Sequence, residues 1–278
     1  MPEMPEIEIL RRELERDISG KKIKSVEATT MKSLGRYKTK KQFADLIEGK
    51  KILGVERRGP YLVMKLEGGE AVVMELGYSA QLVRAKGGRG AVPKGTQITF
   101  TFTQGGLLRL VDTKGESELF VHPLVELAGL PEVAELGIDP LESAMSWIDF
   151  WRVIDKKNGK LKSLLTDRTV LCGIGPVYSD EILFAAGLRH DRESGRLTEQ
   201  EVRRFYRAIV ETMHDAVKYH QSAAAQSART SGDAFDEEHS EHLKVYERDG
   251  QSCRRCRHQI VKVKLGTKNT YFCDACQV

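Results

Sequence analysis

The segment Cys253–Cys276 reads CRRCRHQIVKVKLGTKNTYFCDAC and contains two C-x2-C pairs that are sixteen residues apart. Two intervening residues let both thiolates of a pair point at one centre, and a hairpin returns the second pair to complete a tetrahedron. Two disulfides are the alternative, which is uncommon in a chain without a secretory signal. Because all four positions are cysteine, namely Cys253, Cys256, Cys273 and Cys276, we predict a closed, structural zinc site without an open position for catalysis.

The stretch between the two pairs fits such a hairpin. Residues 259–265 and 270–272 have strand-like composition, and residues 266–269 supply a turn. From Lys244 to Val278 there are eight bases and three acids, so this end carries +5 while the rest of the chain sums to −1. A compact basic end on a near-neutral body indicates a polyanionic partner, although basic clusters are also common on ordinary solvated surfaces.

The whole chain has 278 residues, of which 30% are charged and 40% hydrophobic, with a formal net charge of +4. This length allows one large or two ordinary domains with a sizeable core. The composition excludes wholesale disorder, a collagen-like repeat and a cysteine-rich secreted module. No apolar run approaches the roughly 20 residues of a membrane span, and the acidic N-terminus does not resemble a signal peptide. We therefore expect a cytoplasmic protein without a membrane partner.

Residues 1–125 are rich in short β-type runs that follow one helical segment around residues 7–14. The predicted strands are 23–28, 51–57, 61–66, 71–76, 81–85, 97–103 and 107–111. Residues 98–102 alternate between apolar and polar side chains, and the Gly105-Gly106 turn precedes the next run. Several short strands separated by turns predict a sandwich or barrel.

From about residue 140 the pattern becomes helical, with helices predicted over 146–156, 161–167, 179–186 and 199–219. Gly173-x-Gly175 lies between two of these helices, where backbone amides could approach a phosphate, although such turns are common in helical proteins. Residues 221–236 lack periodicity and predict a linker or mobile loop. Cys172 lies in an apolar stretch and is expected in the core.

Taken together, these features resemble the formamidopyrimidine-DNA glycosylase and endonuclease VIII family of base-excision repair enzymes. The similarity extends over essentially the whole chain and rests on the order and spacing of several short motifs. They are Met1-Pro2-Glu3 with Pro5-Glu6-Ile7-Glu8, Arg57-Arg58-Gly59-x-Tyr61-Leu62, Leu76-Gly77-x-Ser79, Gly173-Ile174-Gly175-x-Val177-Tyr178-x-Asp180-Glu181, Leu243-x-Val245-Tyr246-x-Arg248-x-Gly250 and Thr270-Tyr271-Phe272-Cys273-x-x-Cys276-Gln277.

The resemblance implies an α+β multidomain protein. Its parts would be an N-terminal catalytic β-sandwich over residues 1–130, a helical helix–two-turn–helix (H2TH) domain over 131–242 and a four-Cys zinc finger over 243–278. It also implies a monomer that binds damaged double-stranded DNA between these parts, with one structural Zn²⁺ per chain.

The resemblance further implies a bifunctional DNA glycosylase and abasic-site lyase. After removal of Met1, Pro2 would attack the sugar C1′ through its secondary amine and form a Schiff base, with Glu3 transferring protons and Glu6 supporting the sugar and the amine. An α-amino group has a pKa near 8, so an appreciable fraction is neutral and nucleophilic at cellular pH. Without the other motifs, the expectation for these residues would be a frayed terminus.

The DNA contacts implied by the resemblance are mostly basic or glycine residues. They are Arg57, Arg58, Lys162, Gly173, Gly175, Tyr178 and Lys268, together with Tyr78 in the loop that fills the gap left by a flipped base. A tyrosine at position 78 could stack on bases, or it could be a buried strand residue.

This sequence departs from the family pattern at three phosphate-binding positions. Pro60 replaces a lysine, Pro176 replaces an asparagine, and Lys268 replaces an arginine. In addition, residues 112–115 lack the Arg-Phe pair of the formamidopyrimidine branch. The alternatives to an ordinary glycosylase are therefore a catalytically weakened protein that binds damaged DNA and a glycosylase for bulky or crosslinked lesions.

Overall fold

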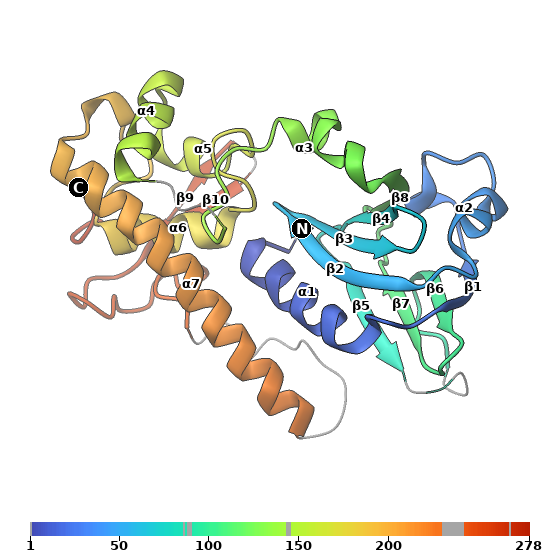
Figure 1. Ribbon diagram of the computed structural model, residues 1–278. Coiled ribbons are helices and arrows are strands. Elements are labelled where there is room, and N and C mark those ends of the chain that lie inside the picture. The colour runs from blue at the N-terminus through green and yellow to red at the C-terminus, as the bar shows by residue number, and fades with distance from the viewer. Residues whose placement is uncertain (1, 86, 88–90, 143–145, 230–241, 267) are drawn as a thin grey trace. The chain divides into compact units, whose positions relative to one another are not determined.

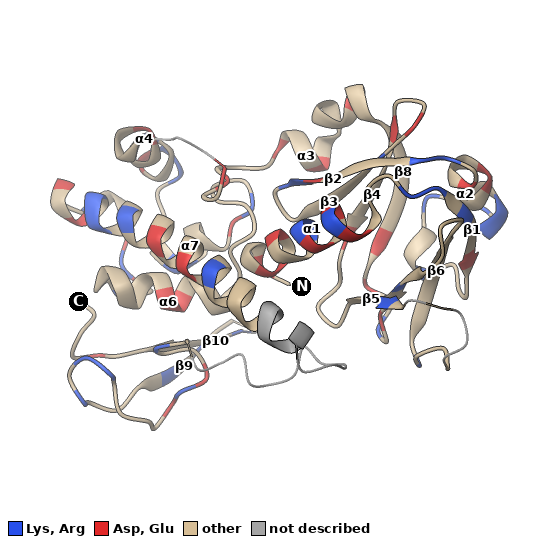
Figure 2. Ribbon diagram, turned by 60° about the horizontal axis from the view of Figure 1, so that its bottom comes forward, with Lys and Arg blue, Asp and Glu red and all other residues tan. Residues whose placement is uncertain are grey.

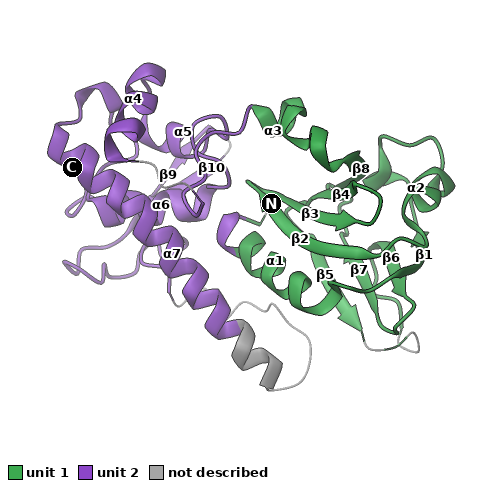
Figure 3. Ribbon diagram, in the orientation of Figure 1, with its two compact units in different colours: residues 1–2, 6–134 green, residues 3–5, 135–278 purple. Residues whose placement is uncertain are grey.

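The computed structural model describes residues 2–85, 87, 91–142, 146–229, 242–266 and 268–278 (Figure 1). These residues form two compact units. Unit 1 contains Pro2 and Glu6–Ala134, and unit 2 contains Glu3–Pro5 and Glu135–Val278 (Figure 3). The first residues of the chain are thus divided, because the short segment Glu3–Pro5 packs with the C-terminal unit.

Unit 1 is a β-sandwich, as predicted, made of two four-stranded antiparallel sheets. The first sheet has the order β1-β6-β7-β5, with β1 Ile23–Ala28, β5 Gln81–Ala85, β6 Thr96–Phe102 and β7 Leu107–Val111. The second has the order β2-β3-β4-β8, with β2 Ile52–Arg58, β3 Tyr61–Leu66, β4 Glu70–Glu75 and β8 Glu118–Pro123. Side chains from both sheets form a single hydrophobic core, to which helix α1 Met4–Ile18 contributes Ile7, Leu14 and Ile18.

One helix, one strand and three short helical segments of unit 1 were absent from the sequence prediction. Helix α2 Lys40–Ile47 begins with a capping box, in which Thr39 accepts from the Gln42 backbone and the Gln42 side chain accepts from Thr39. Strand β8 pairs along all of β4. Three short helical segments complete the unit: η1 Lys32–Leu34, η2 Leu124–Gly129 and α3 Pro131–Ala134.

Unit 2 is helical, as predicted, and ends in a two-stranded hairpin. Its elements are α4 Trp147–Lys157, α5 Leu161–Leu165, α6 Pro176–Ala186, η3 Ser194–Arg196, α7 Glu199–Arg229, β9 Val261–Leu265 and β10 Lys268–Phe272. Helix α6 is buried along nearly its whole length, which agrees with its apolar sequence. Helix α7 begins at Glu199, as predicted, and Thr198 caps it: the Glu201 N–H donates to the Thr198 hydroxyl, and the Glu201 carboxylate accepts from the Thr198 N–H.

The prediction of a linker from residue 221 is wrong for residues 221–229, which continue α7. Three consecutive alanines at 223–225 have the highest helix propensity of any residue, and this outweighs the missing apolar periodicity. The remaining predicted linker residues, 230–236, lie outside the described residues. Lys268 and Asn269, predicted in a turn, belong to β10 instead. No described helix is both long and apolar enough to cross a membrane.

Candidate functional site

Glu3 lies at the N-terminal end of α6, within unit 2. Its side chain is buried, and its carboxylate accepts hydrogen bonds from the backbone N–H groups of Gly175 at 2.7 Å, Val177 at 2.8 Å and Tyr178 at 3.1 Å. Pro176 is the first residue of the helix and has no N–H to donate. A negative charge is favoured at this end of a helix, so Glu3 acts as the cap of α6.

The predicted Gly-x-Gly turn is the place where the N-terminal segment meets unit 2. The Met4 N–H donates to the Gly173 carbonyl at 2.8 Å. Gly173 has a φ of 75°, and a Cβ there would lie 2.5 Å from the Met4 side chain. A Cβ on Gly175 would lie 2.6 Å from Glu3 Oε1. Both glycines are therefore needed for the close approach of residues 3–5. Because the Gly175 amide already donates to Glu3, contact of these glycines with phosphate stays a prediction.

Lys162, predicted to contact DNA, is buried and forms an ion pair with Asp180 at 2.5 Å. The other carboxylate oxygen of Asp180 accepts from the Tyr271 N–H in β10 at 3.0 Å. Burial lowers the pKa of Lys162, although Asp180 and Glu3 oppose this effect. Burial raises the pKa of Asp180 to about 6 in spite of the neighbouring lysine. Lys268 also acts on Lys162 electrostatically, so unit 2 brings together three predicted site residues, Glu3, Lys162 and Lys268.

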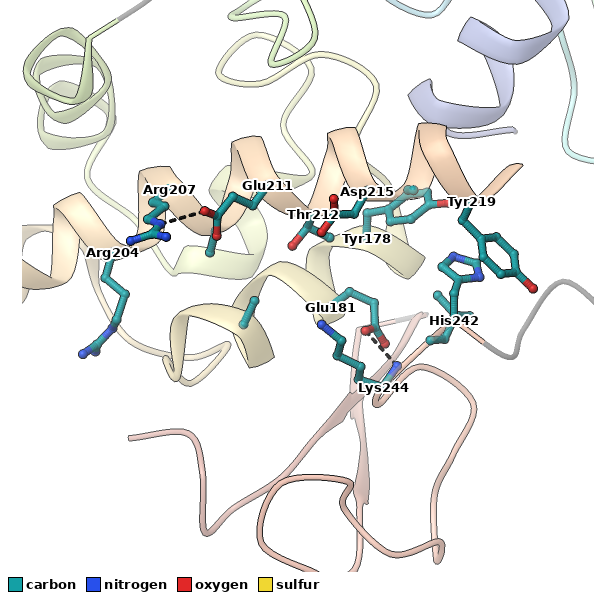
Figure 4. Close-up of a pocket in the computed structure, with 14 residues that line it drawn as sticks. Tyr178, Glu181, Arg204, Arg207, Glu211, Thr212, Asp215, Tyr219, His242 and Lys244 are labelled. Carbon is teal, nitrogen blue, oxygen red and sulfur yellow. Dashed lines mark hydrogen bonds and ion pairs between the residues drawn. The ribbon is translucent and has the colours of Figure 1, made fainter. Parts of the chain in front are cut away.

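Tyr178 is also buried, and its hydroxyl lies 2.9 Å from His220 Nε2 on α7. It lines a cavity of about 530 Å³ between α6, α7 and residues 242–244 (Figure 4). In the same wall the Glu181 carboxylate accepts from the Lys244 N–H at 2.8 Å, while Arg207 and Glu211 form an ion pair along α7. The structure therefore gives Tyr178 a packing role, and its contact with DNA is untested.

In unit 1, Pro2 is half-buried just before α1, and Glu6 lies in the first turn of that helix. Arg57 is only 2% exposed; its guanidinium donates to Glu8 at 3.2 Å and to the Gly59 carbonyl at 3.0 Å. Burial raises the pKa of Glu8, but hydrogen bonds from Arg11, Arg12 and Arg57 outweigh it, and the pKa lies below its usual value. Arg57 thus braces α1 against the β2–β3 turn.

Arg58 and Tyr78 are accessible, unlike Arg57. The Arg58 side chain is half-exposed, forms a long ion pair of 3.5 Å with Glu56 and donates to the Arg57 carbonyl at 3.4 Å. Tyr78 lies in the loop between β4 and β5 and is 70% exposed, which excludes the alternative of a buried strand tyrosine. Lys114 Nζ lies 5.6 Å from the centre of the Tyr78 ring. Pro60 is buried in the β2–β3 turn, and Lys268 is exposed at the start of β10.

The four cysteines of the two C-x2-C pairs converge at one point, with all sulfur atoms within 4.8 Å of one another. Cys253 and Cys276 are 3.9 Å apart, and Cys256 and Cys273 are 3.4 Å apart. Zn–S bonds of about 2.3 Å in a tetrahedron give sulfur separations of about 3.8 Å, whereas a disulfide requires about 2.05 Å. The cysteines are free, so the geometry fits the predicted zinc and excludes the disulfide alternative. Cys172 is buried in the helical core, as predicted.

Asp180 and Glu181, adjacent on α6, attach this finger to the helices. Glu181 accepts from the backbone N–H groups of Lys244, Val245 and Tyr246 at 2.8, 2.8 and 2.9 Å. Phe184, one turn further along α6, packs into the small core of the finger. Figure 2 shows Lys and Arg along the hairpin that this arrangement holds. Sequence reasoning quoted both acids within a motif but assigned them no role.

Comparison with known proteins agrees with this geometry. The chain matches the formamidopyrimidine-DNA glycosylase N-terminal domain over residues 1–118, the formamidopyrimidine-DNA glycosylase H2TH domain over 136–228 and a zinc finger found in FPG and IleRS over 250–278. This chain belongs to the formamidopyrimidine-DNA glycosylase family. The four-cysteine site is accordingly a structural zinc site.

Relatives within this family match along the entire chain. A formamidopyrimidine-DNA glycosylase from Pelotomaculum thermopropionicum is 32% identical and one from Geobacillus kaustophilus is 33% identical; each alignment covers 100% of this chain and at least 99% of the relative. The Lactococcus lactis enzyme in complex with DNA containing an abasic site is 26% identical, with a TM-score of 0.87 and 99% coverage of both chains. Its complex with DNA containing a formamidopyrimidine lesion (Fapy-dG) gives a TM-score of 0.86 at 27% identity.

Proposed function

We propose that this chain is a bifunctional DNA glycosylase and abasic-site lyase of base-excision repair that removes damaged bases from double-stranded DNA. Membership of the family supports this function, as do the solved complexes of a relative with damaged and abasic DNA. The observation in this chain that carries the proposal is the fixed position of Glu3. Its carboxylate is held by three backbone N–H groups, and Glu3 directly follows Pro2 in the sequence.

Pro2 is the proposed nucleophile. Once Met1 is removed, its secondary amine attacks C1′, the C1′–N bond breaks, and the base leaves with the bonding electrons and takes up a proton. Loss of the proton from the proline nitrogen and opening of the sugar ring give an iminium between Pro2 and C1′. This cation makes a C2′ proton acidic, so elimination expels the 3′ phosphate, and water then releases Pro2.

Glu3 and Glu6 are the proposed acid–base residues. Glu3 is proposed to exchange a proton with Pro2 and to stabilise the positive charge that develops at C1′. Glu6 lies one helical turn further, in the first turn of α1, where it supports the sugar and the amine. Capping therefore holds the Glu3 carboxylate in one position without a ligand having to order it.

Among the proposed DNA contacts, the accessible side chains of Arg58 and Lys268 bind phosphates, and Tyr78 fills the gap left by the flipped nucleotide. The buried residues Arg57 and Lys162 act by bracing their neighbours. Gly173, Gly175 and Tyr178 form the turn that receives Glu3. Proline at positions 60 and 176 removes phosphate contacts and their counterion release, so the salt dependence of binding should be shallower than with the family's usual residues. We also propose that the protein acts as a monomer.

Borohydride trapping tests the chemistry, because it reduces the iminium to a stable amine that joins protein to DNA. Wild-type protein beginning at Pro2, verified by intact mass, should give a covalent adduct on a duplex with an abasic site. Pro2→Gly should lower both base release and trapping at least 100-fold, and Glu3→Gln should do the same for base release. Glu199→Gln, at an exposed position on α7, is the matched control and should behave as wild type. A chain that binds damaged DNA tightly but never yields an adduct would contradict the proposal.

A further inference from the structure

Asp112 is a fully buried carboxylate at the end of β7, and no role has been assigned to it so far. Both of its oxygens are saturated with hydrogen bonds. The donors are the backbone N–H groups of Lys114 at 3.1 Å, Gly115 at 2.9 Å, Glu116 at 2.8 Å and Ser117 at 2.8 Å, and the hydroxyls of Ser117 at 2.7 Å and Ser79 at 3.0 Å. A single side chain therefore fixes the whole backbone of residues 114–117.

The same carboxylate joins this loop to a second one, residues 76–80, which carries Tyr78. The Ser79 hydroxyl reaches Asp112 directly, and the Gly77 N–H donates to the Ser117 hydroxyl at 2.9 Å. The loops are in close contact at Gly77, where a Cβ would lie 2.7 Å from the Glu116 Cβ and 3.0 Å from Asp112 Oδ2. The two loops consequently form one body with Asp112 at its centre, all of it within unit 1.

This body presents an aromatic ring to solvent. Tyr78 is 70% exposed, and the Lys114 ammonium lies 5.6 Å from the ring centre. A side chain that enters a base stack must resist the restoring force of the helix, since unstacking costs a few kcal/mol. A ring on a flexible loop would yield and remain outside. A ring on a loop whose backbone is fixed at four consecutive amides transmits the force.

We propose that Asp112 is the positioning residue of the DNA wedge, clamping the loops of Tyr78 and Lys114 into one rigid projection that enters the duplex. This inference rests on the proposed function, and it adds Lys114 as the cation that accompanies the ring. Asp112 acts through Tyr78 and does not touch the reacting atoms.

Six donors converging on one group require an anion. Burial raises the pKa of Asp112, but the hydrogen bonds from Ser117, Gly115 and Ser79 outweigh it and lower the pKa to about 2. The carboxylate is therefore charged at every pH at which DNA repair operates. Asparagine has the same shape but only one acceptor oxygen, and its NH₂ group would face backbone donors. Asp112→Asn is thus a specific disruption of the clamp.

The test compares two substrates with Asp112→Asn. On a duplex with a formamidopyrimidine lesion, kcat/KM should fall at least 10-fold, and the fluorescence rise of 2-aminopurine placed beside the lesion should be lost. On a preformed abasic site, where no base has to be expelled, borohydride trapping should change less than 3-fold. Asp167→Asn is the control, because Asp167 also organises a loop, through Thr169 in unit 2. It should leave both substrates unaffected.

Ser79→Ala provides a second variant that removes only the Ser79–Asp112 bond, one of those that join the two loops. It decides the matter if Asp112→Asn does not fold. Like Asp112→Asn, it should lower kcat/KM on the lesion duplex and leave trapping on the abasic site nearly unchanged, but the fall in kcat/KM should be smaller. Wild-type rates on both substrates in Ser79→Ala and Asp112→Asn, or equal losses on both, would overturn the clamp. Failure of wild-type protein to trap on abasic DNA would instead refute the proposed function itself.

Discussion

Asp112 of unit 1 and Asp180 of unit 2 are both buried aspartates, yet their pKa values shift in opposite directions. Asp112 accepts six hydrogen bonds and its pKa falls to about 2. Asp180 has an ion pair with Lys162 and one backbone donor, and its pKa rises to about 6. At Asp180 burial outweighs the ion pair and raises the pKa, whereas at Asp112 the hydrogen bonds from four backbone amides and two hydroxyls outweigh burial.

The two sets of partners also differ in what their own burial costs. Lys162 must itself be taken out of water, which offsets much of its attraction for Asp180. Backbone amides carry no net charge, and those of a tight turn need acceptors in any case. Asp112 thus organises a loop, whereas Asp180 connects α6 to β10 at the edge of a metal-bound hairpin. Unit 1 is held by its apolar core and this clamp, and the end of unit 2 by zinc and a costly ion pair.

The largest effect expected from this contrast is on loss of the metal. Cys273→Ser removes one of the four zinc ligands and should abolish zinc binding. Structural zinc contributes about 10–16 kcal/mol to the folding of such fingers, so the hairpin should unfold. DNA affinity should fall at least 100-fold, and the amides of β9 and β10 should lose protection from hydrogen exchange. The amides of β6 and β7 should remain protected, since the sandwich core lies within unit 1. Hydrogen exchange measured by mass spectrometry checks the protection of these strands, and elemental analysis checks the zinc content. A hairpin that stays protected without zinc would contradict the view that zinc holds the end of unit 2.

Breaking the buried pair is the next largest effect. Lys162→Met leaves Asp180 without its cation and should cost about 3 kcal/mol at pH 8. The pKa of Asp180 is higher in the folded than in the unfolded protein, so ionisation of Asp180 lowers the free energy of unfolding as the pH rises from about 4 to 6. Without Lys162 the folded pKa is higher still, and this loss continues to higher pH. The cost should therefore shrink at pH 5, where Asp180 is neutral.

Urea unfolding followed by tryptophan fluorescence measures this, because both tryptophans, Trp147 and Trp151, lie in unit 2. Lys157→Met is the matched control, since Lys157 is half-exposed and lies 3.7 Å from Asp167. It should cost less than about 1 kcal/mol and show no such dependence on pH. Equal costs for the two variants would mean that burial of the Lys162 pair does not matter.

Removal of the clamp should have a smaller effect on stability, with the opposite dependence on pH. Asp112→Asn should cost about 1–3 kcal/mol at pH 7 because buried donors lose their acceptor. The folded pKa is about 2 and lies below the unfolded value, so the stabilisation by Asp112 is present above pH 4 and is lost as the pH falls towards 2. The free energies of opening of the β7 amides, measured by native-state hydrogen exchange, should converge between wild type and variant as the pH falls from 4 to 2. A constant difference over this range would show that the charge of Asp112 does not cause the stabilisation.

Much of the framework was predictable because it depends on local patterns. Four of the predicted strands match the structure at both ends, among them β1 and β3, because apolar side chains recur where the core requires them. The zinc ligands followed from spacing alone. Helix α2 was missed although Thr39 and Gln42 carry a recognisable capping box, since only two of its side chains, Phe43 and Ile47, are buried.

The site residues were harder to predict, because their partners are remote in sequence. The amide donors to Glu3 are 172 to 175 residues away in the sequence, and no pattern around Glu3 or around its donors predicts this contact. Arg57 and Lys162 were predicted to contact DNA, and most basic residues are exposed, but Glu8 and Asp180 allow these two to be buried. The hydrogen bonds of Asp112 could not be predicted from the sequence, because aspartate is a common residue in turns.

The smallest predicted effect concerns an ion pair that is exposed to solvent. Its free energy gives a reference against which the two buried aspartates can be compared. Arg203 and Glu199 form an ion pair on α7 with both side chains more than half exposed, and the Arg203 guanidinium lies 4.1 Å from the Trp147 ring centre. Arg203→Ala should cost about 0.5–1 kcal/mol, most of it from the lost ring contact, because exposed pairs are screened by water. A double-mutant cycle with Glu199→Gln, measured by urea unfolding, should give a coupling energy below about 0.5 kcal/mol. A coupling as large as the loss in Lys162→Met would mean that charge attraction alone accounts for both pairs, and that burial adds nothing.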